Sequence, residues 1–176
     1  TTCPQFAECV RIAADVKRAA GLADVKIVLI TDACYLTRPA VEEGLRVMDA
    51  NQGEVWAKLD AGTEEYFRLV NRPNYPLTHV MANITACARV RSVVIQSLFT
   101  RVNDSPPSSA EIEAYVARLK EIQDGGGRIS CVQVYTVSRR PAQTYVTPLR
   151  NTEVDAIVRA VADGTGLRAD AYYGSA

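Results

Sequence analysis

The segment EVWAKLD, residues 54–60, decides the fold class that we expect. Small and aliphatic residues at its odd positions alternate with Trp56, Lys58 and Asp60 at the even ones, which is the two-residue period of a β-strand. A strand with packed layers on both of its faces is normally apolar throughout. Burying charged residues near its carboxyl end costs free energy, unless that face of the strand lines a site. The segment therefore predicts a strand with one face on a ligand cavity. A strand-end ion pair between Lys58 and Asp60 is the simpler alternative.

Strand and helix patterns alternate along the rest of the chain, which predicts an α/β fold with parallel strands and right-handed crossovers. An open doubly wound sheet and a partial (βα) barrel of the TIM type both fit this alternation. A complete eight-fold barrel takes about 250 residues. The chain has 176 residues and opens on a helix pattern, so we expect a partial barrel whose first strands are missing from this chain. We treat residues 1–176 as a single domain.

The predicted strands at residues 25–31, 54–60, 92–98 and 129–137 should be parallel and lie side by side in that order. A last strand is expected near residues 168–173. The predicted helices cover residues 4–20, a segment from Pro39, a short segment opened by Thr63, residues 77–89, a segment opened by a capping box of Ser108 and Glu111, and a segment through 154–161. A long loop is expected after residue 137.

Composition excludes several classes of protein. Hydrophobic residues make up 48% and charged residues 23%, which is typical of a globular chain. The 20 basic and 20 acidic residues balance, so charge gives no support to a nucleic-acid partner, although it does not exclude one. We find no membrane span. The five cysteines are scattered without metal-ligand spacing, which indicates reduced thiols in a cytoplasmic protein. His79, the one histidine, has no Ser or Cys placed as a catalytic partner.

Polar residues recur towards the carboxyl halves of the predicted strands, where α/β folds place their chemistry. Each of them alone can be structural, but together they favour a ligand cavity. After the fourth of these strands, Arg139 and Arg140 lie in the long loop and could bind an anionic substrate group. The candidate cavity residues are Asp32, Lys58, Asp60, Gln96 and Tyr135.

With these residues in view, the sequence resembles the C-terminal part of a radical S-adenosylmethionine (SAM) domain. EVWAKLDAGTEEYFRLVNRP (54–73) is similar to the fourth-strand segment of that superfamily, and VKIVLITDACYL (25–36) to its third strand and turn. VVIQSLF (93–99) and VQVYTVSRRPA (132–142) resemble the fifth and sixth strands. Within the superfamily, the chain most resembles the Fe–S oxidoreductase group that includes wyosine-forming tRNA-modification enzymes.

The resemblance implies a full-length enzyme that cleaves SAM at a 4Fe–4S cluster and abstracts a hydrogen atom from a substrate that it does not identify. It implies that Lys58 binds the methionine carboxylate of SAM and that Asp60 orients Lys58. Asp32 would approach the SAM ribose or amino group, Gln96 the ribose, and Tyr135 the adenine.

One departure from the family pattern is large. The family binds its cluster through CxxxCxxC, and this motif is absent, so we expect no metal ligands in this chain and no activity from it alone. Cys3 and Cys9 have the wrong spacing for the cluster. Two other hypotheses stay open: a Schiff-base lyase or aldolase with Lys58 as nucleophile and Asp60 as proton shuttle, and a non-catalytic ligand-binding remnant.

Overall fold

Five parallel strands form the main sheet of the computed structural model, which describes residues 1–174. Their order in the sheet is β1-β2-β3-β5-β7, and every neighbouring pair is parallel. Chain order and sheet order agree, so the sheet is not doubly wound, and the predicted partial-barrel arrangement is confirmed. The strands are β1 (Ile27–Thr31), β2 (Gly53–Lys58), β3 (Val93–Leu98), β5 (Ile129–Tyr135) and β7 (Ala169–Tyr172).

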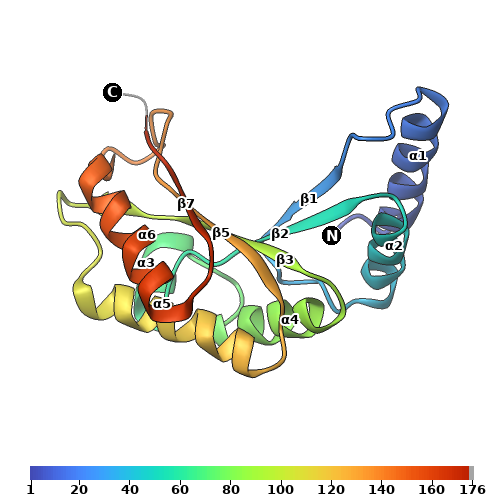
Figure 1. Ribbon diagram of the computed structural model, residues 1–176. Helices are drawn as coiled ribbons and strands as arrows, with labels where there is room; N and C mark the ends of the chain where they lie inside the picture. The colour runs from blue at the N-terminus through green and yellow to red at the C-terminus, as the bar shows by residue number, and fades with distance from the viewer. Residues whose placement is uncertain (175–176) are drawn as a thin grey trace.

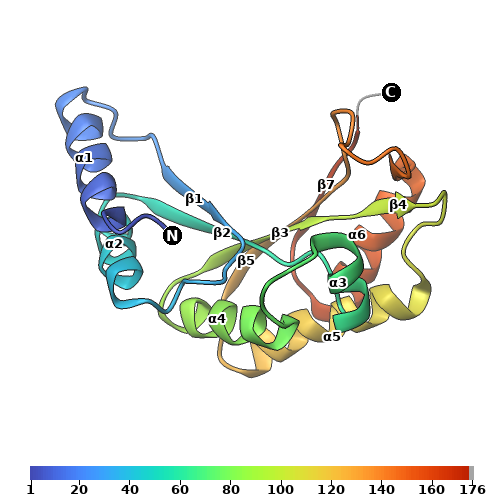
Figure 2. The same cartoon turned by 180° about the vertical axis from the view of Figure 1, so that it is seen from behind.

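The helices lie on one side of this sheet and leave the other side open (Figure 1). Seen from behind, α4, α5 and α6 again run beneath the strands, while α1 and α2 stand together near β1 (Figure 2). No helix within residues 1–174 is long and apolar enough to cross a membrane. The helices are α1 (Phe6–Ala19), α2 (Pro39–Asp49), α3 (Glu64–Asn71), α4 (Leu77–Val90), α5 (Ser109–Asp124) and α6 (Asn151–Thr165).

The predicted alternation of side chains along β2 is confirmed. Val55, Ala57 and Leu59 belong to the buried core and are at most 2% exposed. Lys58 lies between Ala57 and Leu59 in the chain and points to the open side of the sheet, where Tyr135 of β5 contacts it. Burial of the apolar face under the helices fixes this register, because a slip of one residue would move Lys58 into the core.

Strand β1 lies at one edge of the sheet and, within residues 1–174, pairs with β2 alone. Its side chains Val28 and Ile30 are 39% and 56% exposed, although both are apolar. Ile27 and Leu29 alternate with them and pack against the core. This end of the open face is therefore apolar and exposed.

A second, two-stranded sheet includes part of the segment after residue 137, where a simple loop was expected. Strand β4 (Thr100–Val102) pairs antiparallel with β6 (Val146–Pro148). A strand of three residues is too short to be recognised from the alternation of apolar and polar residues. The two strands are also far apart in the sequence, because α5 and β5 lie between them. The pairing brings the long loop after β5 back to the carboxyl end of β3.

Candidate functional site

Lys58, Asp60 and Tyr135 form one cluster at the carboxyl ends of β2 and β5. The Lys58 ammonium lies 3.3 Å from Asp60 Oδ1. It also donates a hydrogen bond to the Tyr135 hydroxyl and sits 4.9 Å from the centre of that ring. Lys58 thus contacts two of the other four predicted cavity residues.

This cluster keeps the Lys58 amine protonated. Burial by itself lowers the pKa of Lys58, but the charge of Asp60 and the hydrogen bond to Tyr135 outweigh it, so the pKa is raised above its ordinary value. A Schiff-base lysine needs a lowered pKa, because the neutral amine is the nucleophile. The geometry therefore favours a fixed cation over the aldolase hypothesis.

Asp60 holds the end of β2 in place. Its carboxylate is 3% exposed and accepts hydrogen bonds from the Leu98 backbone N–H and from Asn71 Nδ2, both at 2.8 Å. Together with Lys58, these donors join β2, β3 and α3 through one buried group. Asp60 therefore orients the Lys58 cation, and its carboxylate oxygens have little remaining capacity to accept hydrogen bonds from a ligand.

Gln96 continues the polar face towards β5 and β7. It pairs in register with Lys58 on one side and with Gln133 on the other, and its Nε2 donates to Gln133 Oε1 at 3.1 Å. Gln133 in turn pairs with Asp170 of β7. We missed Asp170 from the sequence, although the alternation in Ala-Asp-Ala-Tyr (169–172) could have signalled it. A polar row thus crosses four strands of the open face.

Asp32 lies in the turn after β1 and is exposed. Its Oδ1 accepts the backbone N–H of Cys34 at 3.1 Å, and Ala33 between them has a left-handed backbone, with φ of 64°. Helix α4 holds this turn, since Asn83 Nδ2 donates to the carbonyl of Ala33 at 3.0 Å. His79 Nε2 lies 2.9 Å from the Cys34 carbonyl oxygen, so the one histidine has a structural role.

A hollow of about 270 Å³ opens beside Lys58. Asp32, Lys58 and Asp60 line it, whereas Gln96 and Tyr135 do not. The remaining lining residues come from the turn after β1, from α3 and from the segment that joins α3 to α4. They are Cys34, Tyr35, Phe67, Asn71, Arg72, Pro73, Asn74 and Tyr75.

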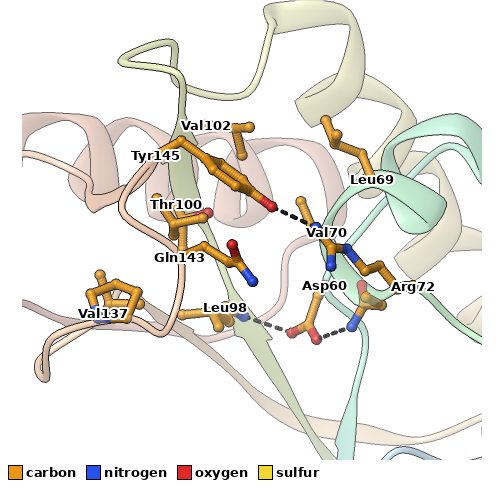
Figure 3. Close-up of a pocket in the computed structure, with 13 residues that line it drawn as sticks. Asp60, Leu69, Val70, Arg72, Leu98, Thr100, Val102, Val137, Gln143 and Tyr145 are labelled. Atoms are coloured by element: carbon orange, nitrogen blue, oxygen red, sulfur yellow. Dashed lines mark hydrogen bonds between the residues drawn. The ribbon is translucent and has the colours of Figure 1, made fainter.

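A second hollow, of about 330 Å³, adjoins the first and shares Asp60, Asn71 and Arg72 with it (Figure 3). It lies between the end of α3, the β4–β6 pair and the loop after β5. Arg139 and Arg140 are exposed and line neither hollow. Other residues of the long loop, Pro141, Gln143 and Tyr145, line the second hollow, and a role for Arg139 and Arg140 in binding an anion stays a prediction.

Glu111 corrects a prediction made from the sequence. Ser108 Oγ accepts the Glu111 N–H at 3.1 Å, as in a capping box, but the Glu111 carboxylate does not return to Ser108. It accepts instead from the backbone N–H of Gly62 at 2.5 Å and from Thr63 Oγ1 at 2.6 Å. Arg118 donates to the Gly62 carbonyl at 2.9 Å. Helix α5 thus clamps the loop that carries Asp60, because tertiary partners outcompete the local cap.

The described residues do not form a ligand set for a 4Fe–4S cluster. Within residues 1–174, no three His, Cys, Asp or Glu side chains gather in a way that could hold a metal ion. Burial raises the pKa of the Cys34 thiol, and of the Cys131 thiol, to about 11, which disfavours the thiolate that a metal requires. Cys3 and Cys9 are exposed.

Comparison with known proteins supports the fold. No protein-family model matches the chain, and no curated protein matches it in sequence. Among solved structures, it is similar to a radical SAM methyltransferase from Sphaerobacter thermophilus, with a TM-score of 0.60 and 18% identity. This similarity, together with the strand order, supports an α/β partial-barrel fold. The match covers 84% of this chain but only 40% of the methyltransferase, and the resemblance to wyosine-forming enzymes stays a prediction.

Proposed function

We propose that this chain forms the SAM-binding part of a radical SAM enzyme, in which Lys58 binds the methionine carboxylate of SAM. The observation that carries the proposal is a protonated, half-buried lysine beside a hollow at the carboxyl end of a central strand. In parallel α/β folds this end of the sheet holds ligands. The fold shared with the methyltransferase gives independent support.

The other polar residues have distinct roles in this proposal. Asp60 orients Lys58, and the exposed Asp32 carboxylate accepts hydrogen bonds from the amino group or ribose of SAM. Gln96 and Tyr135 lie outside the hollow but beside Lys58 on the open face, where Gln96 would face the ribose and Tyr135 would flank the adenine. In the full-length enzyme, SAM bound at a reduced cluster would supply the radical chemistry, and the residues of this chain would only bind and orient it. We assign no reductive step to this chain, because its residues do not fit the cluster.

The finer assignment rests on sequence resemblance. Residues 54–73 favour an Fe–S oxidoreductase of the group that includes wyosine-forming enzymes, and the scattered, unpaired cysteines favour the cytoplasm. A non-catalytic remnant that keeps the cavity would bind SAM in the same way, so turnover by a cluster-loaded protein separates these two possibilities.

Calorimetric titration of SAM into the wild type and Lys58→Met tests the proposal. Loss of one charge-assisted hydrogen bond should weaken binding by about 1.5–3 kcal/mol, roughly tenfold to a hundredfold. Lys26→Met is the matched control, because Lys26 pairs with Glu54 at the opposite end of β2 and lies outside the hollow. Equal SAM affinity in wild type and Lys58→Met, together with a large loss of thermal stability, would show that Lys58 serves only the ion pair with Asp60.

A further inference from the structure

The second hollow, which Figure 3 shows, has no role in the proposed binding of SAM. Its volume of about 330 Å³ lies within the range of small-molecule sites. It lies beside the Lys58 hollow, and Asp60, Asn71 and Arg72 form the wall between the two. A ligand in the second hollow would therefore be next to a ligand in the first.

Most of the wall of this second hollow is apolar. Leu69 of α3 lines it and is 54% exposed, so its side chain is accessible to a ligand. Leu98, Val102 and Val137 line it from the strands and the loop. An apolar wall with few polar groups is typical of a site for a small organic molecule.

Arg72 provides the positive charge of this second hollow. It forms no ion pair with any carboxylate in the described chain, and its Nη2 donates to the Tyr145 hydroxyl at 2.5 Å. The other charged residue of the lining is Asp60, whose oxygens already accept from Lys58, Asn71 and the Leu98 N–H. The hollow therefore offers a guanidinium whose charge no carboxylate of its lining neutralises.

The backbone fixes Arg72 at this place. It ends α3 with a left-handed conformation, φ of 47° and ψ of 53°, which is costly for a residue other than glycine. Pro73 follows, so the helix cannot continue. Strained residues of this kind cluster at ligand sites. Figure 3 also shows the Gln143 side chain extending into the hollow, where it can donate a hydrogen bond.

We propose that the second hollow binds a small organic anion, with its carboxylate or phosphate on Arg72 and its apolar body against Leu69 and Leu98. Arginine suits this task, because its planar donors match both kinds of oxyanion. That the anion is the substrate of the SAM-dependent reaction rests on the proposed function; the binding site itself does not.

Titration of the ¹⁵N-labelled chain with 4-phenylbutyrate, phenyl phosphate and the neutral 4-phenylbutan-1-ol tests this proposal by NMR. At least one anion should bind saturably and shift the amide signals of residues that line the hollow, and the tighter of the two identifies the head group. The alcohol should bind about tenfold more weakly. Arg72→Asn should weaken anion binding about tenfold, and asparagine tolerates the left-handed backbone at this position. Arg68→Gln removes a charge one turn earlier in α3 and should leave anion binding unchanged.

Leu69→Trp separates this proposal from the proposed function. A tryptophan there should fill the hollow and abolish anion binding while SAM affinity stays unchanged. Anion binding without any SAM binding would overturn the assignment of the anion as substrate. Equal binding of the alcohol, no effect of Arg72→Asn or Leu69→Trp, or an equal loss in Arg68→Gln would overturn the site.

Discussion

The two loops that meet at the candidate site are built in opposite ways. The loop of residues 60–63 is held on all sides, by the Glu111 carboxylate, by Arg118 and by the core beneath Asp60. The loop of residues 138–145 is mostly exposed, and its residues 138–142 make no hydrogen bond to the rest of the described chain. The first loop fixes a charged cluster to within hydrogen-bond distances. The second provides side walls that can adapt to a ligand.

The largest effect should come from Gly62→Ala. A Cβ at this position would lie 2.0 Å from the backbone nitrogen of Tyr115, and neither backbone can yield easily. We expect a loss of about 3 kcal/mol in the free energy of unfolding, measured by urea denaturation. Gly21→Ala is the control, because only its φ of 65° is unfavourable there and nothing lies within 4 Å; its loss should be about 1 kcal/mol. Similar losses in the two variants would show that the loop is not clamped against α5.

Glu111→Ala should have the next largest effect. It would leave the buried N–H of Gly62 and the hydroxyl of Thr63 without their acceptor, so we expect a loss of about 2 kcal/mol. Glu113→Ala, in the same turn of α5 but exposed, should change stability by less than about 0.5 kcal/mol. The same denaturation curves measure both, and equal stability of the two variants would contradict the clamp.

A smaller, pH-dependent effect follows from the Lys58 cluster that the rigid loop supports. Because the folded-state pKa of Lys58 is raised, its contribution to stability is complete below the unfolded value of about 10.4 and is lost as pH rises through the folded value. The difference in melting temperature between wild type and Lys58→Met should be constant from pH 7 to about 10 and shrink above that. A difference that already shrinks between pH 7 and 9 would mean that the pKa is lowered.

The smallest effect should come from the adaptable loop. Replacing Arg139 and Arg140 together by alanine should change the free energy of unfolding by less than about 0.5 kcal/mol, because both side chains are exposed. Binding of 4-phenylbutyrate or phenyl phosphate should also be unchanged, since neither arginine lines a hollow. Weaker anion binding in this double variant would show that Arg139 and Arg140 do take part in binding the anion, as the sequence predicted.

The sequence predicts the sheet well and the site in part. The order of the strands follows from the alternation of strand and helix patterns along the chain. The side to which Lys58 points follows from the two-residue alternation of side chains in residues 54–60. The partner of Glu111 could not be read in this way, because Gly62 lies 49 residues away and a good local cap was available. Arg72 and Tyr145 were missed for a similar reason, since only the β4–β6 pairing brings their segments together. Local patterns thus predict elements, whereas contacts between loops depend on the assembled fold.

The exposed edge at β1 has a practical consequence for work with this chain in solution. Its outer backbone groups have no strand partner within residues 1–174, and Val28 and Ile30 beside them are exposed. A bare, apolar edge of this kind templates pairing with other chains, and proteins commonly suppress it with lysine or proline. Colloidal stability will therefore limit the concentration at which the chain can be studied. A lysine in place of Ile30 would improve it without touching either hollow.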